Sequence, residues 1–164
     1  MDLFDAELLQ LFDAFHRNAF RYILVGGFAT NHHGYNRTTG DVDIWMEDNV
    51  ANRQTLRKTM AELDYGDLKE LETVPLIAGW TTITLDSNIS LDLMSEIKGF
   101  DKTDFDSCYQ SASVNYIHEI PVRFLSYNNL IKAKKATGRT KDIMDVEELE
   151  RIKNANEDNT RNDI

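Results

Sequence analysis

Residues 22–46 of this sequence read YILVGGFATNHHGYNRTTGDVDIWM, and they carry its clearest structural pattern. The stretch begins with a continuous apolar run, Tyr22 to Val25, which is typical of a short buried strand. Gly26-Gly27 ends that run, and residues 28–33 are long enough for one or two helical turns. After a polar loop, residues 41–46 alternate acidic and apolar side chains, a period of two that predicts a half-buried strand.

Asp41 and Asp43 lie two residues apart in the second of these strands. Residues at i and i+2 project to the same face, so both carboxylates are expected at one spot, with Val42 and Ile44 directed to the core. Two carboxylates this close repel unless a cation lies between them, and hard oxygen ligands suit Mg²⁺. On its own, an Asp-x-Asp pattern is more often a pair of ordinary surface acids.

Gly26-Gly27 makes the aspartate pair more informative. A strand that ends in glycines and leads into a helix lets backbone N–H groups approach a phosphate closely. The pair matches neither the dinucleotide fingerprint nor the P-loop, and alone it indicates only a tight turn. Followed by a short helix and an Asp-x-Asp strand, it indicates a phosphate cradle beside a metal pair, the arrangement that holds nucleoside triphosphates.

The composition is that of an acidic globular chain. Its 164 residues contain 18 Lys and Arg against 28 Asp and Glu, a net charge of −10. Such a chain lacks the attraction that long nucleic acids exert on basic proteins, which disfavours a non-specific DNA or RNA binder. A hydrophobic content of 41% and only two prolines exclude a disordered or low-complexity chain.

Three features favour a cytoplasmic location. Cys108 is the only cysteine, so no intrachain disulfide can form. The sequence begins Met-Asp-Leu-Phe-Asp, acidic where a signal peptide would be basic. No run approaches the roughly 20 apolar residues that a membrane helix needs, so we expect no membrane partner.

Apolar spacing and turn residues predict the remaining elements. Helices are expected over about 3–15, 49–63, 126–137 and 140–153, and strands over 81–85, 89–94, 114–117 and 122–125. Pro121 suggests an edge position for the last pair of strands. We therefore expect one α+β domain over residues 1–153, with a mixed sheet flanked by helices, a C-terminal helical pair, and a polar, disordered tail over 154–164.

The ordered motifs resemble those of the nucleotidyltransferase superfamily of the polymerase-beta type. The superfamily's pattern is matched in order by Val25-Gly26-Gly27, then 13 residues (28–40), then Asp41-Val42-Asp43-Ile44. More narrowly, the chain is similar to a small prokaryotic group related to the AbiEii-type toxins. That likeness is carried by Gly26-Gly27-Phe28-Ala29, His33-Gly34, Arg37, Thr39, Asp41 to Ile44, Leu130-Ile131, Lys134, Gly138-Arg139, Lys141-Asp142 and Asp145. It spans about residues 20–150, and Gly27 stands where many relatives have Ser.

The resemblance implies a nucleotidyltransferase fold and a two-metal mechanism. The third metal carboxylate of the superfamily comes from a later, neighbouring strand, and Asp92 fits that place better than Asp86 or Glu96. Asp41, Asp43 and Asp92 would then be the catalytic residues and hold two Mg²⁺ ions. The reaction implied is transfer of a nucleoside monophosphate, with AMP from ATP as the expected case, to a hydroxyl acceptor.

Positive groups are expected around the triphosphate. Residues 132–141 contain five basic side chains and no acid. Lys134 and Arg139 are expected to reach the β- and γ-phosphates, and Lys134 matches the family position. Arg37 is expected in the same cleft, as a phosphate clamp or as a partner of the aspartate pair. The nucleotide-binding set is thus Gly26, Gly27, Arg37, Lys134 and Arg139. The alternative for the basic segment is that its cations complement a helix dipole.

Other conspicuous side chains receive a structural interpretation. Asp142 and Asp145 are expected on a solvated helix face, with Asp142 able to brace Arg139. Trp45 and Trp80 are expected to pack in the core or at the rim of the cleft rather than to stack on a base.

The acceptor and the partner stay open at this point. A protein side chain, a tRNA 3′ end or a small molecule fits the chemistry, and small relatives often work in toxin–antitoxin or phage-defence pairs, so a protein partner is expected by resemblance. One alternative is a non-catalytic nucleotide-binding module, regulatory or antitoxin, of the same fold. Another is an antibiotic nucleotidyltransferase.

Overall fold

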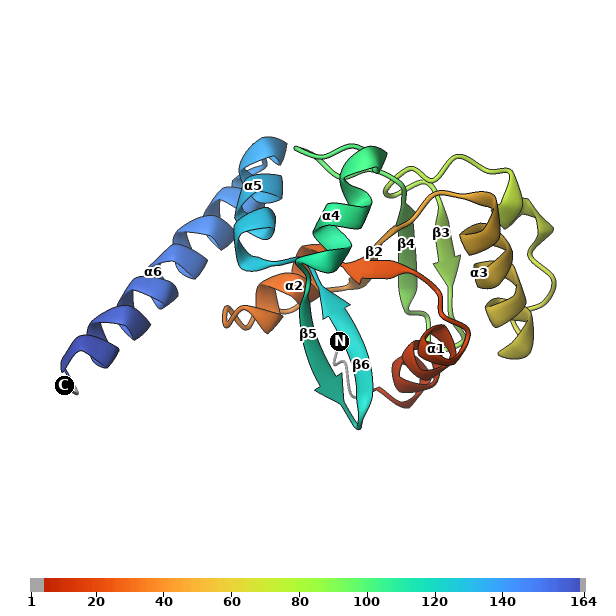
Figure 1. The fold of residues 1–164 in the computed structure, drawn as a ribbon, viewed down its shortest axis with the longest axis horizontal. Helices are drawn as coiled ribbons and strands as arrows, with labels where there is room; N and C mark the ends of the chain where they lie inside the picture. Colours follow the sequence, from red (N-terminus) through yellow and green to blue (C-terminus); the bar gives the residue numbers. More distant parts are fainter. Residues whose placement is uncertain (1–4, 163–164) are drawn as a thin grey trace.

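The computed structural model describes residues 5–162 and shows an α+β architecture built on one mixed sheet (Figure 1). The six strands of the sheet run in the order β3-β4-β2-β1-β6-β5. Their bounds are β1 Tyr22–Leu24, β2 Asp41–Met46, β3 Thr82–Thr84, β4 Ser90–Met94, β5 Ser113–Ile117 and β6 Ile120–Phe124. β2 pairs in parallel with β4 and β1 in parallel with β6, while the β1–β2, β3–β4 and β5–β6 pairs are antiparallel.

The helices cover both faces of this sheet. They are α1 Ala6–Arg17, α2 Gly26–His32, α3 Val50–Glu62, α4 Phe105–Gln110, α5 Tyr127–Thr137 and α6 Thr140–Asn162, with short 3-10 turns at Lys69–Glu72 and Lys102–Asp104. One hydrophobic cluster joins α1 and α3 to the face that carries Val42 and Ile44. A second cluster joins α2, α4, α5 and α6 to the face that carries Trp45. Both faces of β2 are therefore buried beyond the aspartate pair.

The central stretch folds as its pattern predicts. β2 covers the predicted residues 41–46, Val42 and Ile44 are fully buried, and Asp41 and Asp43 are half-buried on the other face. Trp45 shares the face of the aspartates, as its place two residues further along the strand requires, and it is fully buried as predicted. The aspartates thus lie where the covered part of that face ends.

The predicted helix and strand order is confirmed, with small changes at the ends. Asp5 caps α1, whose predicted members Leu3 and Phe4 lie outside the described residues. Gly138, with a φ of 64°, ends α5 as predicted. α4 was not predicted, because its six residues are too short to show a helical period.

Pro121 lies in β6, between two other strands, and not in an edge strand as predicted. β1 has only three residues, and it is registered with β6 only at Leu24 and Phe124. Pro121 is three residues before that pair, so its missing N–H falls outside the short parallel ladder. The proline is tolerated because its neighbour is short.

α6 continues to Asn162, nine residues beyond the predicted helix end at Lys153. Residues 154–162 are therefore helical and not the disordered tail that the sequence suggested, while 163–164 lie outside the described residues. This segment contains no Gly or Pro, so nothing in it breaks a helix that has already started. In Figure 1 the end of α6 projects away from the sheet.

No helix within the described residues is long and apolar enough to cross a membrane.

We expect Ile44→Ala to lower the free energy of unfolding by about 2–5 kcal/mol, because it deletes a fully buried side chain from the sheet core. Ile143→Ala is the matched control, since Ile143 is exposed on α6, and it should change stability by less than about 0.5 kcal/mol. Urea unfolding of both variants measures the difference. Equal losses would contradict the assignment of this face of β2 to the core.

Candidate functional site

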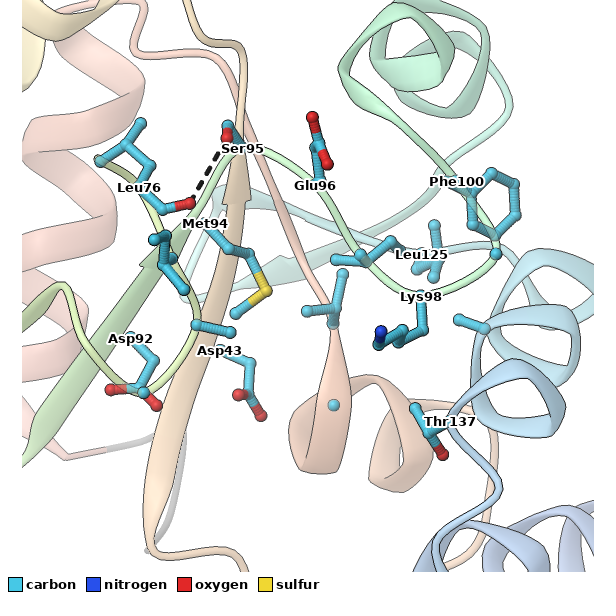
Figure 2. A pocket seen from close by; sticks show the side chains of 18 of the residues that line it. Asp43, Leu76, Asp92, Met94, Ser95, Glu96, Lys98, Phe100, Leu125 and Thr137 are labelled. Atoms are coloured by element: carbon cyan, nitrogen blue, oxygen red, sulfur yellow. Dashed lines mark hydrogen bonds between the residues drawn. The ribbon is translucent and has the colours of Figure 1, made fainter.

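Three carboxylates converge where β2 and β4 run side by side. The parallel register places Asp43 opposite Asp92 and Asp41 opposite Ser90. Carboxylate oxygens of Asp41, Asp43 and Asp92 all lie within 4.8 Å of one another. Figure 2 shows Asp43 and Asp92 together at one end of a cavity. The structure thus brings together the three acids that the sequence singled out.

The two competing acids do not join this cluster. Asp86 lies in the turn between β3 and β4, where its N–H donates to the Glu7 carboxylate. Glu96 lines the same cavity, but Figure 2 shows its carboxyl group directed away from Asp43 and Asp92. Within the described residues, the acid cluster is therefore made by the two parallel strands alone.

Neutral donors support the acid cluster. Thr82 Oγ1 donates to Asp92 Oδ1 at 2.6 Å, and Thr39 Oγ1 donates to Asp41 Oδ1 at 3.3 Å. The backbone N–H of Gly27 donates to Asp43. No ion pair to any of the three carboxylates occurs among the side chains that the structure describes. The cluster is thus rich in negative charge and hard oxygen atoms, a donor set that fits a divalent cation such as Mg²⁺.

The crowding of the three carboxylates changes the pKa of Asp43. Burial raises the pKa of its carboxyl group, and the neighbouring charges of Asp41 and Asp92 raise it further, to about 6. The Gly27 N–H and the more distant Lys134 act in the opposite direction. A bound cation would remove this repulsion, because it would stabilise the charged form of all three groups.

The glycine pair is fixed by its neighbours in the site. Gly26 has a φ of 56°, and a Cβ atom there would lie 1.8 Å from Asp43 Oδ2. At Gly27 a Cβ atom would lie 2.3 Å from Thr39 Oγ1, so a serine at this position does not fit this loop as it stands. Gly26 lines the cavity, whereas Gly27 does not, and the Gly27 N–H lowers the pKa of Asp43.

The acid cluster opens into a cavity of about 950 Å³. Two loops, residues 75–79 and 94–100, form one part of its wall, and α5 forms another. Its other lining residues are Val25, Gly26, Asp48, Arg53, Leu125, Arg139 and Asp142. Trp80 follows the first loop and is 87% exposed, so it does not pack in the core or rim as predicted. Leu76 is the buried residue of that loop, while Ile77 to Gly79 are exposed like the indole.

The cations of the predicted nucleotide site form an ion network around two buried carboxylates. Lys134 Nζ lies 2.6 Å from Asp145 Oδ2 and 3.0 Å from Asp142 Oδ1. Arg37 donates to both oxygens of Asp145, at 2.8 and 2.9 Å, and Arg139 Nε donates to Asp142 at 2.6 Å. We call these five residues the ion network. It links the loop before β2 to α5 and α6.

The ion network corrects three expectations. Asp142 and Asp145 are buried, not on a solvated face, because each neutralises cations that α5 and Arg37 bring inside. Arg37 pairs with Asp145 rather than with Asp41 or Asp43, and it does not line the cavity. Lys134 lines the cavity but is 4% exposed and holds two carboxylates. The brace between Asp142 and Arg139 is present as predicted.

The other basic side chains of residues 132–141 do not gather at one place. Lys132 Nζ lies 3.9 Å from the centre of the Phe100 ring, and Lys135 pairs with Glu150 on the surface. Arg139 lines the cavity with a largely exposed side chain. Lys98 also lines the cavity, although the sequence analysis did not select it. The sequence feature that could have indicated a turn at Lys98 is the Lys-Gly pair between apolar Ile97 and Phe100.

No protein-family model matches this sequence, and no curated protein matches it with significant similarity. Function is therefore inferred from the residues and their geometry.

We expect Gly26→Ala to destabilise the protein more than Gly66→Ala does. Both glycines have a positive φ, so both variants carry backbone strain, but only at Gly26 does the new Cβ meet Asp43; at Gly66 it meets nothing within 4 Å. The overpacking adds about 1–3 kcal/mol at Gly26. Urea unfolding measures both losses, and equal values would show that the contact with Asp43 is relieved without cost.

Acid should destabilise the protein partly through Asp142. Burial opposes ionisation of this carboxyl group, but hydrogen bonds from Arg139, Thr137 and Lys134 outweigh it and lower its pKa from 3.8 to about 2. Between these two pH values the unfolded chain binds more protons, so stability falls as the pH drops from about 4 towards 2. The contribution is fully present above pH 4 and amounts to about 2 kcal/mol.

Asp142→Asn should therefore be less stable than wild type at pH 7 and lose less stability on acidification. Asp158→Asn is the control, because Asp158 is exposed on the same helix. Urea unfolding at a series of pH values checks both variants. A wild-type acid slope retained by Asp142→Asn would contradict this role.

Proposed function

We propose that this protein is a Mg²⁺-dependent nucleotidyltransferase that takes a nucleoside triphosphate, with ATP the expected donor, and transfers its nucleoside monophosphate to a hydroxyl group. One observation carries the proposal: Asp41, Asp43 and Asp92 converge from two parallel strands at the end of a large cavity, beside the Gly26-Gly27 turn. The motif order in the sequence, which resembles the polymerase-beta type superfamily, supports the same activity and the same fold.

The acid cluster is the group of residues that would hold Mg²⁺. Its three carboxylates have no cationic partner among the described side chains, and they face a cavity rather than the core. When bound, Mg²⁺ ions supply charge neutralisation for the triphosphate and lower the pKa of an acceptor hydroxyl. The protein itself holds three negatively charged groups close together. Hydrogen-bond donors on Gly27, Thr39 and Thr82 stabilise these carboxylates.

The proposed reaction assigns a role to each of these groups. The acceptor oxygen forms a bond to the α-phosphorus, the bond from that phosphorus to the bridging oxygen breaks, and pyrophosphate leaves. The acceptor proton passes to the Asp92 carboxylate, which retains Oδ2 for it while Oδ1 accepts from Thr82. Arg139, which lines the cavity and is braced by Asp142, stabilises charge on the leaving pyrophosphate.

One observation favours a second candidate, a nucleotide-binding module that transfers nothing. Arg37 and Lys134, expected to bind phosphate, are held by Asp145 and Asp142 instead. This leaves fewer cations for a leaving pyrophosphate than the sequence suggested. Such a module would bind the Mg²⁺ complex of ATP through the same acid cluster, so binding and transfer have to be measured separately.

We expect Asp43→Asn and Asp92→Asn to lower transfer by at least about a hundredfold, because each removes a charge from the acid cluster. The assay incubates protein, MgCl₂ and α-labelled ATP with a cell lysate and follows label into macromolecules and small molecules. Asp86→Asn is the control, since Asp86 lies in the turn before β4 and outside the cluster, and it should retain full activity.

Calorimetric titration of ATP with and without MgCl₂ completes the test. Binding that requires Mg²⁺, together with transferred label, supports the transferase. Binding without transfer of label supports the non-catalytic module. Absence of both, or unchanged behaviour of Asp43→Asn, would contradict the proposed function.

A further inference from the structure

A tight turn places Lys98 on the wall of the cavity. Ile97 and Phe100 form a β-bridge, and the Phe100 N–H donates to the Ile97 carbonyl at 2.9 Å. Gly99, with a φ of 86°, supplies the conformation that this turn needs. Lys98 and Gly99 are therefore the two central residues of the turn, which fixes the Lys98 backbone.

The turn is packed against its surroundings on two sides. A Cβ atom at Gly99 would lie 3.2 Å from the Ala136 side chain, so the backbone of the turn lies directly on α5. The Phe100 ring lies 5.8 Å from Trp45 in the core and carries Lys132 Nζ on its face. The backbone that carries Lys98 is thus held by packing on α5 and by Phe100 against the buried Trp45, although the Lys98 side chain itself is exposed.

The Lys98 amine is directed into the cavity. Figure 2 shows its side chain reaching from the turn into the space between Asp43 and Thr137. No carboxylate pairs with Lys98 among the described side chains. Lys134, in contrast, is buried between two aspartates. Lys98 is therefore the lysine of the cavity wall whose charge is not already neutralised by an ion pair.

Positive and negative charges are unevenly distributed along the cavity wall. The acid cluster contributes three negative charges at one end, while Lys98 and Arg139 contribute cations on other parts of the wall. Of the other acids in the wall, Asp48 and Asp142 are paired with cations, and Glu96 points away from the acid cluster. A Mg²⁺-chelated triphosphate matches this pattern, because its metal-bound end suits the acids and its remaining anionic oxygens need cations. Lysine is a compact point charge with three rotatable donors, well suited to phosphate.

We propose that Lys98 binds the β- and γ-phosphates of the nucleoside triphosphate, in the role that the sequence suggested for Lys134. This inference rests on the proposed function, since it names a residue that binds the triphosphate donor. Lys134 and its two aspartates then act as structural members of the ion network, and Lys98 and Arg139 are the cations that meet the ligand.

Calorimetric titration of ATP, AMP and tripolyphosphate in MgCl₂ tests this role. We expect Lys98→Gln to weaken binding of ATP and of tripolyphosphate by about tenfold or more, because one charge-assisted contact is lost, and to leave AMP affinity unchanged. Lys98→Arg, which retains the charge, should keep most of the ATP affinity. Lys102→Gln is the matched control: it removes the same charge from an exposed lysine outside the cavity and should bind all three ligands as wild type does.

The outcomes separate this inference from the proposed function. If wild type binds ATP and Asp43→Asn does not, but Lys98→Gln binds as Lys102→Gln does, the role of Lys98 is overturned while the acid cluster stands. An equal loss of ATP and AMP affinity in Lys98→Gln would also overturn it, because that pattern excludes a contact confined to the β- and γ-phosphates. If wild type binds no nucleotide, both proposals fail. Thermal unfolding of the Lys98 variants should match wild type, since this side chain is exposed.

Discussion

The parallel pairing of β2 with β4 is the constraint on which the rest of the site depends. Neighbouring strands lie about 4.8 Å apart, so the register that places Asp43 opposite Asp92 forces two like charges to that spacing. Asp41 adds a third charge from the same face of β2. Gly26 is confined by this arrangement, since Asp43 occupies the space where a side chain would be.

A second electrostatic arrangement, the ion network, lies on the α5 side of the cavity. In the ion network, three cations surround two buried carboxylates, which leaves one net positive charge close to the acid cluster. Burying such groups is costly unless each has a partner, and here each has one. The network therefore serves to join α5 and α6 to the loop before β2. Most charges on this side of the cavity are paired with one another. Exposed groups such as Arg139 and Lys98 remain accessible to bind a ligand.

The sequence was most informative where a pattern has a local cause. The alternation at Asp41 to Met46 and the stop at Gly138 follow from strand period and glycine conformation, and both were predicted correctly. Ion pairs between residues far apart in the sequence were harder to predict. Nothing local to Asp142 or Asp145 shows that Lys134 and Arg37 will be buried against them, so these acids resembled a solvated helix face. Lys98 was missed because its position depends on a turn docking onto α5.

The ion network also limits how the cavity can change shape. If α5 moved away from the loop before β2, Lys134 or Asp145 would be left buried with a charge unmatched. The wall formed by α5 is therefore tied through α6 to the loop that precedes the aspartate strand, and separating the two costs free energy. Ile77, in another part of the cavity wall, extends into solvent, so a movement of its side chain exposes little apolar surface that is not exposed already.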